Sequence, residues 1–298
     1  MRNALYCEER NMAGILYLVA TPIGNLEDMT FRAVRVLKEA DLIAAEDTRN
    51  SIKLLNHFEI KTPMTSYHEF NKYDKADFLI SKLIEGQNIA LITDAGTPGI
   101  SDPGEVMAAK CYEAGIPVVP VPGACAAINA LIASGQPTRR FAFEAFLPSD
   151  KKERKAVLDE LKDETRTTVI YEAPHRLVKT LKELRDVLGA ERSLTLCKEL
   201  TKKHEGFVMT TLGEAVEYFD NGSDENAPRG EYVLVIKGKS AEELEAEKAA
   251  AWVDISVTEH VDRYIAGGMS KKDAIKQVAL DRNLPKREVY AAVENAGS

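Results

Sequence analysis

Three segments rich in glycine and proline have the composition from which ligand-binding loops are built. They are TPIGN at 21–25, DAGTPGISDPG at 94–104 and VPGAC at 121–125. Glycine lets backbone N–H and C=O groups approach a ligand closely, and proline fixes the shape of a loop in advance. One such segment alone is typical of a tight turn between a strand and a helix. Three of them at one edge of a sheet favour a shared binding site.

The expected ligand of these loops is neither a dinucleotide nor a nucleoside triphosphate. The G-x-G-x-x-G fingerprint is absent. The GKS sequence at 238–240 matches the end of a P-loop, but the first glycine of that motif would fall on Val233, inside a predicted strand. A nucleoside-like ligand held by backbone atoms fits the three segments better.

The framework that must position these loops is an alternation of strand-like and helix-like segments. Short apolar strands are predicted at 15–20, 42–45, 64–67, 89–93 and 117–121, with amphipathic stretches between them. This alternation predicts an α/β fold with a mostly parallel sheet and helices on both faces. The three loops then follow strands at the carboxyl edge, where open α/β sheets bind ligands.

The second half of the chain has a different pattern, because strand-like segments there adjoin in sequence. Strands are predicted at 141–146, 168–171, 193–198, 207–211 and 232–236, with helices at 151–162, 175–188 and 212–219. This order predicts a mixed α+β sheet. The expected organisation is an extension at 1–13, an α/β lobe at 14–136, an α+β lobe at 137–238, a linker at 239–251 and a helical tail at 252–298.

Eight short motifs resemble one protein family. They are TPIGNL at 21–26, AEDTR at 45–49, SYHEFN at 66–71, LITDAGTPGISDPG at 91–104, VPGACA at 121–126, YEAPHRL at 171–177, ELTKKHE at 199–205 and GEYVLVIKG at 230–238. Together they are similar to the tetrapyrrole methylase-like, S-adenosylmethionine-dependent methyltransferases. Within that family they resemble the branch that methylates a cytidine ribose 2′-hydroxyl in the decoding centre of 16S rRNA. The resemblance implies a two-lobe fold that holds S-adenosyl-L-methionine in a cleft between the lobes.

The resemblance also implies which residues hold the cofactor. Tyr171 and Glu172 match the strand-end position of the family near the adenine, and Asp94 could meet the amino group of the methionyl part. No metal is implied. The complete expected set is Pro22, Gly24, Asp94, Gly96, Thr97, Pro98, Ile100, Ser101, Ala124, Cys125, Tyr171 and Glu172.

The implied reaction makes its own demand on the site. A ribose hydroxyl is a poor nucleophile until its proton is accepted, so a base or a polarising cation should lie near it. Polar candidates at the ends of two predicted strands are Glu46, Asp47, Arg49, His68, Glu69 and Asn71, of which the favoured catalytic candidates are Asp47, Arg49, His68 and Glu69. Asp47 could equally be only a helix N-cap, His68 could have no chemical role, and Arg49 could hold a phosphate.

Basic side chains gather in two places that could contact RNA phosphates. The candidate RNA-binding residues are Arg139, Arg140, Lys151, Lys152, Lys202 and Lys203, with Arg154, Lys155 and His204 beside them. A solvated helix face is the ordinary meaning of such a run, but an RNA substrate favours phosphate contacts. The expected partner is 16S rRNA or the assembled small ribosomal subunit.

The tail carries signals of two short helices joined by a tight turn. Ser270 begins a capping-box-like start, and Pro285 occupies a favourable position at the start of the next helix. A helix-turn-helix and an appendage for packing or dimerisation both fit this pattern.

Composition bounds these interpretations. The chain has 298 residues and is 45% apolar, which predicts two globular domains. Its formal charge of −8 argues against a protein that coats nucleic acid indiscriminately. Four cysteines without regular spacing favour reduced thiols rather than a disulfide framework or a zinc site. The apolar run at 15–20 is too short for a signal peptide or a membrane span.

We therefore expect a cytoplasmic enzyme without a membrane partner, which the family resemblance suggests to be a homodimer. Two other interpretations stay open at this point. One is a methylase of the same fold that acts on a tetrapyrrole or another small molecule. The other is a non-catalytic RNA-binding factor in ribosome assembly.

Overall fold

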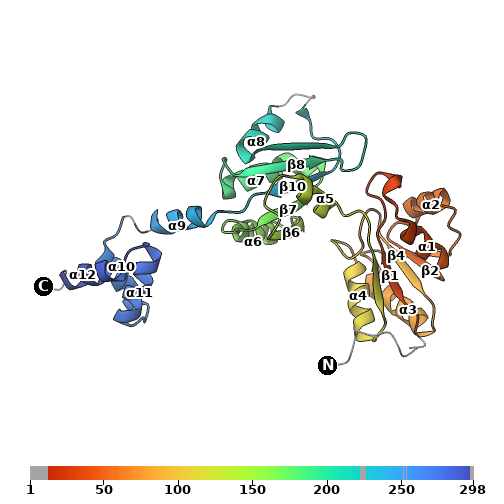
Figure 1. The fold of residues 1–298 in the computed structure, drawn as a ribbon, viewed down its shortest axis with the longest axis horizontal. Helices are drawn as coiled ribbons and strands as arrows, with labels where there is room; N and C mark the ends of the chain where they lie inside the picture. Colours follow the sequence, from red (N-terminus) through yellow and green to blue (C-terminus); the bar gives the residue numbers. More distant parts are fainter. Residues whose placement is uncertain (1–12, 222–225, 251, 253, 296–298) are drawn as a thin grey trace. The chain divides into compact units, whose positions relative to one another are not determined.

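A five-stranded parallel sheet forms the framework of the first lobe. The computed structural model describes residues 13–221, 226–250, 252 and 254–295, so the predicted extension lies almost wholly outside the described residues. The strands lie in the order β3-β2-β4-β1-β5, and every pairing is parallel. Of these strands, β1, β2 and β4 are labelled in Figure 1. Their bounds are β1 Leu16–Val19, β2 Leu42–Ala45, β3 Met64–Ser66, β4 Ile89–Ile92 and β5 Val118–Val121. The predicted α/β class is confirmed.

Helices cover both faces of this sheet because its strands are buried on both sides. All four residues of β4 are buried. On one face, residues of α1 and α2 such as Leu37 and Leu55 join a core cluster with Val19, and on the other, Leu79 of α3 and Met107 of α4 pack with the sheet. The helices are α1 Phe31–Glu39, α2 Thr48–His57, α3 Lys72–Ile84, α4 Gly104–Glu113 and α5 Ala126–Ala133, with a 3-10 turn, η1, at Leu26–Asp28.

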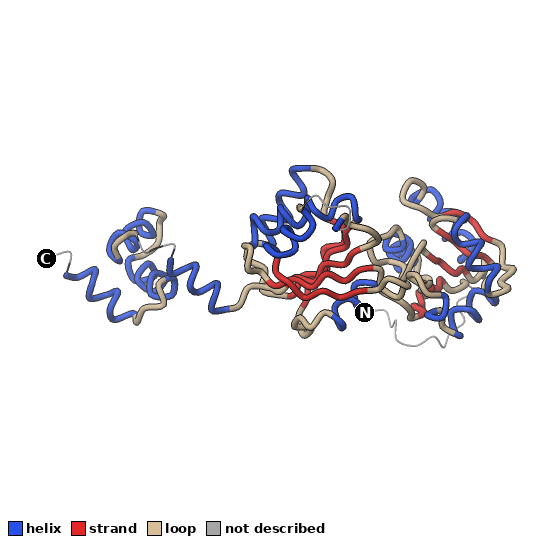
Figure 2. The backbone as a smooth tube through the Cα atoms, turned by 90° about the horizontal axis from the view of Figure 1, so that it is seen from above, coloured by secondary structure: helices blue, strands red, loops and turns tan. Residues whose placement is uncertain are grey.

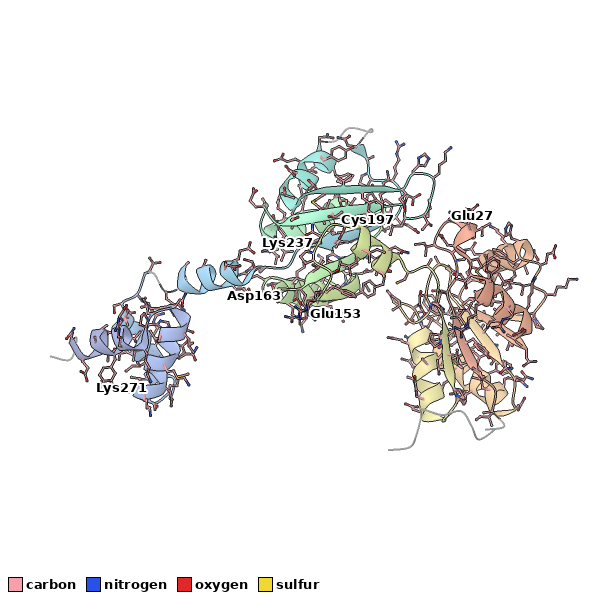
Figure 3. The ribbon with its side chains drawn as sticks, in the orientation of Figure 1. Glu27, Glu153, Asp163, Cys197, Lys237 and Lys271 are labelled. Atoms are coloured by element: carbon pink, nitrogen blue, oxygen red, sulfur yellow. The ribbon has the colours of Figure 1, made fainter. Side chains whose placement is uncertain are left out.

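The second sheet is mixed, as the sequence predicts. Its order is β6-β7-β10-β8-β9, with β6 and β7 parallel and the other pairs antiparallel. The strands are drawn in red in Figure 2. Cys197, labelled in Figure 3, lies in β8. The strands are β6 Phe141–Phe146, β7 Thr167–Glu172, β8 Ser193–Lys198, β9 Gly206–Thr211 and β10 Tyr232–Ile236, and the helices are α6 Lys151–Leu161, α7 Pro174–Leu188 and α8 Leu212–Asp220.

Helix α5 belongs to the first lobe by sequence but packs against the second sheet. Its Ala130 and Leu131 share a core cluster with Val169 and Val235, and Ile23 from the loop after β1 joins the same cluster. The helix is apolar around most of its circumference, so its amphipathic pattern is weak, and the sheet it covers is decided by tertiary packing. This packing ties the loops of the first sheet to the second.

The chain divides into two compact units. One is formed by the chain up to Asp159 together with Thr167–Ile236, and the other by Glu160–Arg166 together with the chain from Lys237 onward. The first unit contains both sheets. In the second, Lys239 Nζ lies 3.3 Å from Oδ1 of Asp163, which is labelled in Figure 3.

Three helices of the second unit surround a core of their own. Val261, Ile275, Val278 and Val289 are buried there, and Ser270 caps α11 by accepting a hydrogen bond from the Asp273 N–H at 3.2 Å. The helices of this unit are α9 Ala241–Ala250, α10 Val257–Ala266, α11 Lys271–Asp281 and α12 Lys286–Asn295. Across the described part of the chain, no helix combines the length and apolar character that a membrane crossing requires.

Candidate functional site

Hydrogen bonds join the three glycine- and proline-rich loops into one assembly. Thr21 and Gly96 exchange two backbone hydrogen bonds, with N···O distances of 2.9 and 3.1 Å. The Thr97 hydroxyl donates to the Ala124 carbonyl at 2.9 Å. The loop after β4 is therefore bonded to the loops after β1 and β5, and the expectation that the three segments share one edge of the sheet is confirmed.

Glycine is required at position 96 for two separate reasons. Its φ of +88° lies in the left-handed region, and an added Cβ would stand 3.1 Å from Ile23 Cγ2 and 3.3 Å from the Ala124 carbonyl oxygen. The close approach of the three loops thus depends on the missing side chain.

Asp102 shapes the remainder of the long loop. Its carboxylate accepts hydrogen bonds from the backbone N–H groups of Gly99, Ile100 and Gly104 at 2.8 to 3.1 Å. Between them, Ser101 has a φ of +67°, an uncommon conformation for a residue with a side chain. The loop is therefore held in one defined and partly strained shape.

A cavity of about 420 Å³ opens beside this assembly and is lined by residues from both sheets. The loop after β4 supplies much of one wall, and the end of β7 with the start of α7 supplies another. Of the residues expected to bind the cofactor, those that line the cavity are Asp94, Gly96, Thr97, Ile100, Ser101, Cys125, Tyr171 and Glu172. Pro22, Gly24, Pro98 and Ala124 lie in the same loops without lining it.

Gly24 packs against the second lobe. A Cβ at this position would meet Lys202 Cγ at 2.3 Å, so the glycine makes room for a side chain from the second lobe. Lys202 itself is held by Glu199 and Glu231, each at 2.9 Å from its Nζ atom.

Tyr171 supports the site from the second lobe. Its hydroxyl oxygen accepts a hydrogen bond from the Ala127 N–H at 2.9 Å, at the first turn of α5. Burial raises the pKa of Tyr171 to about 12, so the phenol stays neutral at physiological pH. It therefore positions the end of the VPGAC loop, a contact that the sequence did not predict.

Glu172 is buried, and its carboxylate is already bonded within the protein. One oxygen accepts from the Ala173 N–H at 2.9 Å, the other from the Thr180 hydroxyl, and the Arg176 guanidinium lies 3.5 Å away. Glu172 lines the cavity as a part of its wall.

Phe146 is a lining residue that the sequence did not single out. A β-bulge interrupts β6 between Phe143 and Phe146, and the intervening Ala145 has a φ of +50°. The Phe146 ring is half exposed and meets the Tyr171 ring edge-on, with the centroids 5.6 Å apart. Bulges re-aim side chains beside binding sites, but the alternation of β6 gives no sign of this one.

The cavity is acidic. Burial raises the pKa of both Glu46 and Asp94 above their usual values, and each is raised further by a neighbouring carboxylate. The carboxylates among the lining residues are Glu46, Asp94, Asp102, Glu172 and Glu231. A site of this kind favours a ligand with positive charge.

Thr93, which lines the same cavity, has a hydroxyl without a partner. The residue is 5% exposed, and no hydrogen-bond partner lies near Oγ1 among the described residues. Buried hydroxyls are normally paired, so the wall of the cavity retains unused bonding capacity.

None of the four favoured catalytic candidates lines the cavity. Asp47 caps α2 by accepting from the Arg49 N–H at 2.8 Å, Arg49 is exposed, and Glu69 pairs with Lys72. The Nδ1 atom of His68 is buried without a partner among the described residues, but His68 is not a lining residue either. Glu46 is the member of the wider set of six that does line the cavity.

The structure also separates the predicted basic cluster. Arg139 and Arg140 precede β6, whereas Lys151 and Lys152 begin α6, which follows the opposite end of that strand. A strand of six residues spans about 20 Å at 3.3 Å per residue. Arg154 is buried and donates to Glu183 and Thr180, so its inclusion in a phosphate-binding run was wrong.

The predicted group after β8 is divided as well. Lys203 and His204 are exposed, whereas Lys202 is occupied by its two carboxylate partners. Lys151, Lys152 and Lys155 are exposed on α6, the helix that follows the cavity end of β6.

The thiols offer no metal chemistry in the described part of the chain. Cys111 and Cys197 are buried, which raises the pKa of each to about 12. Within the described residues, no three acidic, histidine or cysteine side chains form a group that could hold a metal ion.

Comparison with known proteins agrees with this geometry. Residues 15–216 match the model of the tetrapyrrole (corrin/porphyrin) methylases. The chain is 51% identical to the ribosomal RNA small subunit methyltransferase I of Halalkalibacterium halodurans, over 95% of this chain and 96% of the relative. It is 47% identical to the protein of that name from Bacillus subtilis, over 98% of both chains.

Solved structures show the same fold at lower identity. Uroporphyrin-III C-methyltransferase from Thermus thermophilus, determined in complex with S-adenosylhomocysteine, superposes with a TM-score of 0.51 at 22% identity, over 75% of this chain and 97% of that one. Diphthine synthase gives a TM-score of 0.56 at 12% identity, over 75% of this chain and 90% of that one.

Proposed function

Because the chain belongs to the tetrapyrrole methylase family, we propose that its acidic cavity binds S-adenosylmethionine and that the enzyme methylates ribosomal RNA of the small subunit. The finer proposal is transfer to the ribose 2′-hydroxyl of a cytidine in the decoding centre of 16S rRNA. The observation that carries the proposal is the three-loop assembly with its acidic cavity, in a chain about half identical to small-subunit rRNA methyltransferases over nearly its full length.

The cavity suits this cofactor on three counts. S-adenosylmethionine supplies a methyl group on a positively charged sulfur, and Glu46 and Asp94 provide negative charge without an ion-pair partner among the described residues. Gly96, which has no side chain, lines the cavity in the loop after β4, and Thr93 holds an unused hydroxyl. Asp94 is the residue proposed to face the ammonium group of the methionyl part.

The chain then contributes mainly position. The hydrogen-bonded loops and the wall formed by Tyr171 and Glu172 hold the cavity in a fixed shape, so the methyl group and the acceptor hydroxyl can meet in line. Lys151, Lys152 and Lys203 are the exposed cations proposed to contact RNA phosphates.

Methylation of defined substrates tests the proposal. Small ribosomal subunits and naked 16S rRNA from a strain that lacks the enzyme are incubated with protein and methyl-labelled S-adenosylmethionine, digested to nucleosides and separated. The expected product is 2′-O-methylcytidine. Label on a base would contradict the ribose assignment. Label in no RNA would favour the small-molecule methylase or the non-catalytic factor.

Two further expectations are measured on the same protein. Calorimetry with S-adenosylhomocysteine should show binding, and its absence would contradict both enzyme interpretations. Light scattering should give the mass of a homodimer.

A further inference from the structure

Glu46 lies where the two sheets' loops meet the cavity. It is the first residue after β2, and Ala45 pairs with Ile92 at the end of β4. The next positions along the two strands, Glu46 and Thr93, both line the cavity. The parallel register therefore delivers this carboxylate to the wall next to the loop proposed to hold the cofactor.

Three of the other four lining carboxylates are already engaged. Asp102 accepts three backbone N–H groups, Glu172 accepts Ala173 and Thr180, and Glu231 is paired with Lys202. Asp94 accepts the Asp47 N–H at 3.0 Å and is assigned to the cofactor's ammonium group.

Glu46 has more unused bonding capacity. Within the described part of the chain, its hydrogen-bond donor is the Asp94 N–H, and that contact is long, 3.4 Å to Oε2. No described Lys, Arg or His forms an ion pair with it. A side chain that must receive a proton from a substrate needs an oxygen that the protein leaves free.

The surroundings of Glu46 also make its carboxylate a stronger base. Burial is the main cause that raises its pKa, and the charges of Asp94, Asp102 and Glu69 act in the same direction. A carboxylate with a raised pKa takes up a proton more readily near neutral pH.

We propose that Glu46 is the catalytic base that accepts the proton of the substrate hydroxyl; this inference rests on the proposed function. The hydroxyl oxygen forms a bond to the methyl carbon while the carbon–sulfur bond breaks and sulfur keeps the electron pair. The hydroxyl proton passes to a carboxylate oxygen of Glu46, which afterwards returns it to water.

The test compares Glu46→Gln with Asp94→Asn and with the control Glu85→Gln. Glu85 lies at the end of α3, on the surface, in an ion pair with Lys82. Each variant is assayed for kcat and KM on small subunits, for S-adenosylhomocysteine affinity by calorimetry, and for thermal unfolding. Glu46→Gln should lower kcat by about 10²- to 10⁴-fold, the usual contribution of a general base. Its Kd for S-adenosylhomocysteine should stay within about twofold of the wild-type value.

Asp94→Asn should instead weaken S-adenosylhomocysteine binding, and Glu85→Gln should match wild type in every assay. The kcat/KM of wild type should fall as the pH drops through the pKa of Glu46, because the base becomes protonated. The residual kcat/KM of Glu46→Gln should not show this decrease at low pH. Glu46→Asp, which keeps the carboxylate, should recover part of the lost kcat.

Three outcomes would overturn the assignment of Glu46. The first is a kcat of Glu46→Gln within about fivefold of wild type. The second is a decrease of kcat/KM at low pH that is the same in Glu46→Gln as in wild type. The third is a loss of S-adenosylhomocysteine affinity in Glu46→Gln as large as its loss of kcat. The last would make Glu46 a cofactor-binding residue. Failure of wild type to methylate any ribose would refute the proposed function itself, and the two failures are thereby distinguished.

Discussion

Side chains around the cavity differ in how much of their bonding capacity the fold uses. Asp102, Tyr171 and Glu172 make hydrogen bonds that hold loops and helix ends in place. Glu46 and Thr93 line the same space with capacity unused. Since an unpaired buried polar group costs stability, ligand binding is expected to compensate for the unpaired Thr93 hydroxyl.

Thr93→Val should stabilise the ligand-free protein by about 1 kcal/mol, because valine keeps the shape and removes a buried hydroxyl without a partner. The same change should weaken S-adenosylhomocysteine binding about tenfold, a loss of about 1.4 kcal/mol. Urea unfolding and calorimetry measure the two effects.

Thr195→Val is the matched control, because the Thr195 hydroxyl is buried and donates to the Ser134 carbonyl at 2.8 Å. This variant should lose about 1 kcal/mol and keep its affinity for the ligand. Equal destabilisation of the two variants would show that the Thr93 hydroxyl is satisfied after all.

At the scale of elements, the site depends on loops that are bonded to one another. The Thr21–Gly96 bridge and the Thr97–Ala124 hydrogen bond join loops that follow three different strands. Helix α5 then connects the same assembly to the second sheet. A local change in the loop after β4 should therefore alter the shape of the whole cavity and its affinity for ligand.

Gly96→Ala tests this coupling against Gly115→Ala. Both glycines have positive φ, +88° and +69°, but an added Cβ at Gly115 meets nothing within 4 Å. Each variant should lose about 1 kcal/mol of stability from backbone strain. Gly96→Ala alone should weaken S-adenosylhomocysteine binding, by at least about tenfold in calorimetry, because its methyl group presses on Ile23 and Ala124. Equal affinities would contradict the coupling.

At the scale of the whole molecule, the net charge of −8 means that binding to RNA phosphates must depend on local groups of basic residues. Lys151 and Lys152 follow the cavity end of β6, and Arg139 and Arg140 precede the other end. The sequence treats these four residues as one cluster, and the length of the strand separates them.

Lys151→Glu with Lys152→Glu should therefore raise the KM for small subunits about tenfold at moderate salt. Arg139→Glu with Arg140→Glu, which changes net charge equally, should raise it less than about threefold. Neither should change S-adenosylhomocysteine affinity, and added salt should shrink the difference. Equal effects of the two pairs would show that overall charge, and not position, governs binding.

We expect the stability of the second unit to depend on pH. His260 is fully buried, stacks on Trp252 with ring centroids 3.7 Å apart, and accepts a hydrogen bond at Nδ1 from Arg282. Burial, followed by the charge of Arg282, lowers the pKa of His260 below its usual value. The imidazole of His260 therefore binds a proton more readily in the unfolded chain than in the folded one. The free energy of unfolding of this unit should fall as the pH drops below about 6.5.

Trp252 is the single tryptophan of the chain, so its fluorescence reports on this unit. The urea midpoint followed by this signal should decrease between pH 7.5 and 5.5 in wild type. His260→Gln should show a smaller decrease, and an equal one would assign the pH dependence to other groups.

Local patterns determined the elements of this protein. Every strand of both sheets lies within one residue of its predicted ends, because short apolar runs bounded by Gly, Pro or Asp are read from neighbouring residues alone. The loops at 21–25, 94–104 and 121–125 could be assigned to one edge for the same reason, since parallel strands must present their carboxyl ends together.

Tertiary structure decided which side chains are free to act. The sequence favours Asp47, Arg49, His68 and Glu69 over Glu46, and only the tertiary structure shows that Glu46 lines the cavity while Asp47 caps a helix. The bulge that turns Phe146 toward the cavity has no local signal either. Hydrogen-bond partners far apart in the chain decide which groups the fold uses and which remain for the substrate, and no local pattern carries that information.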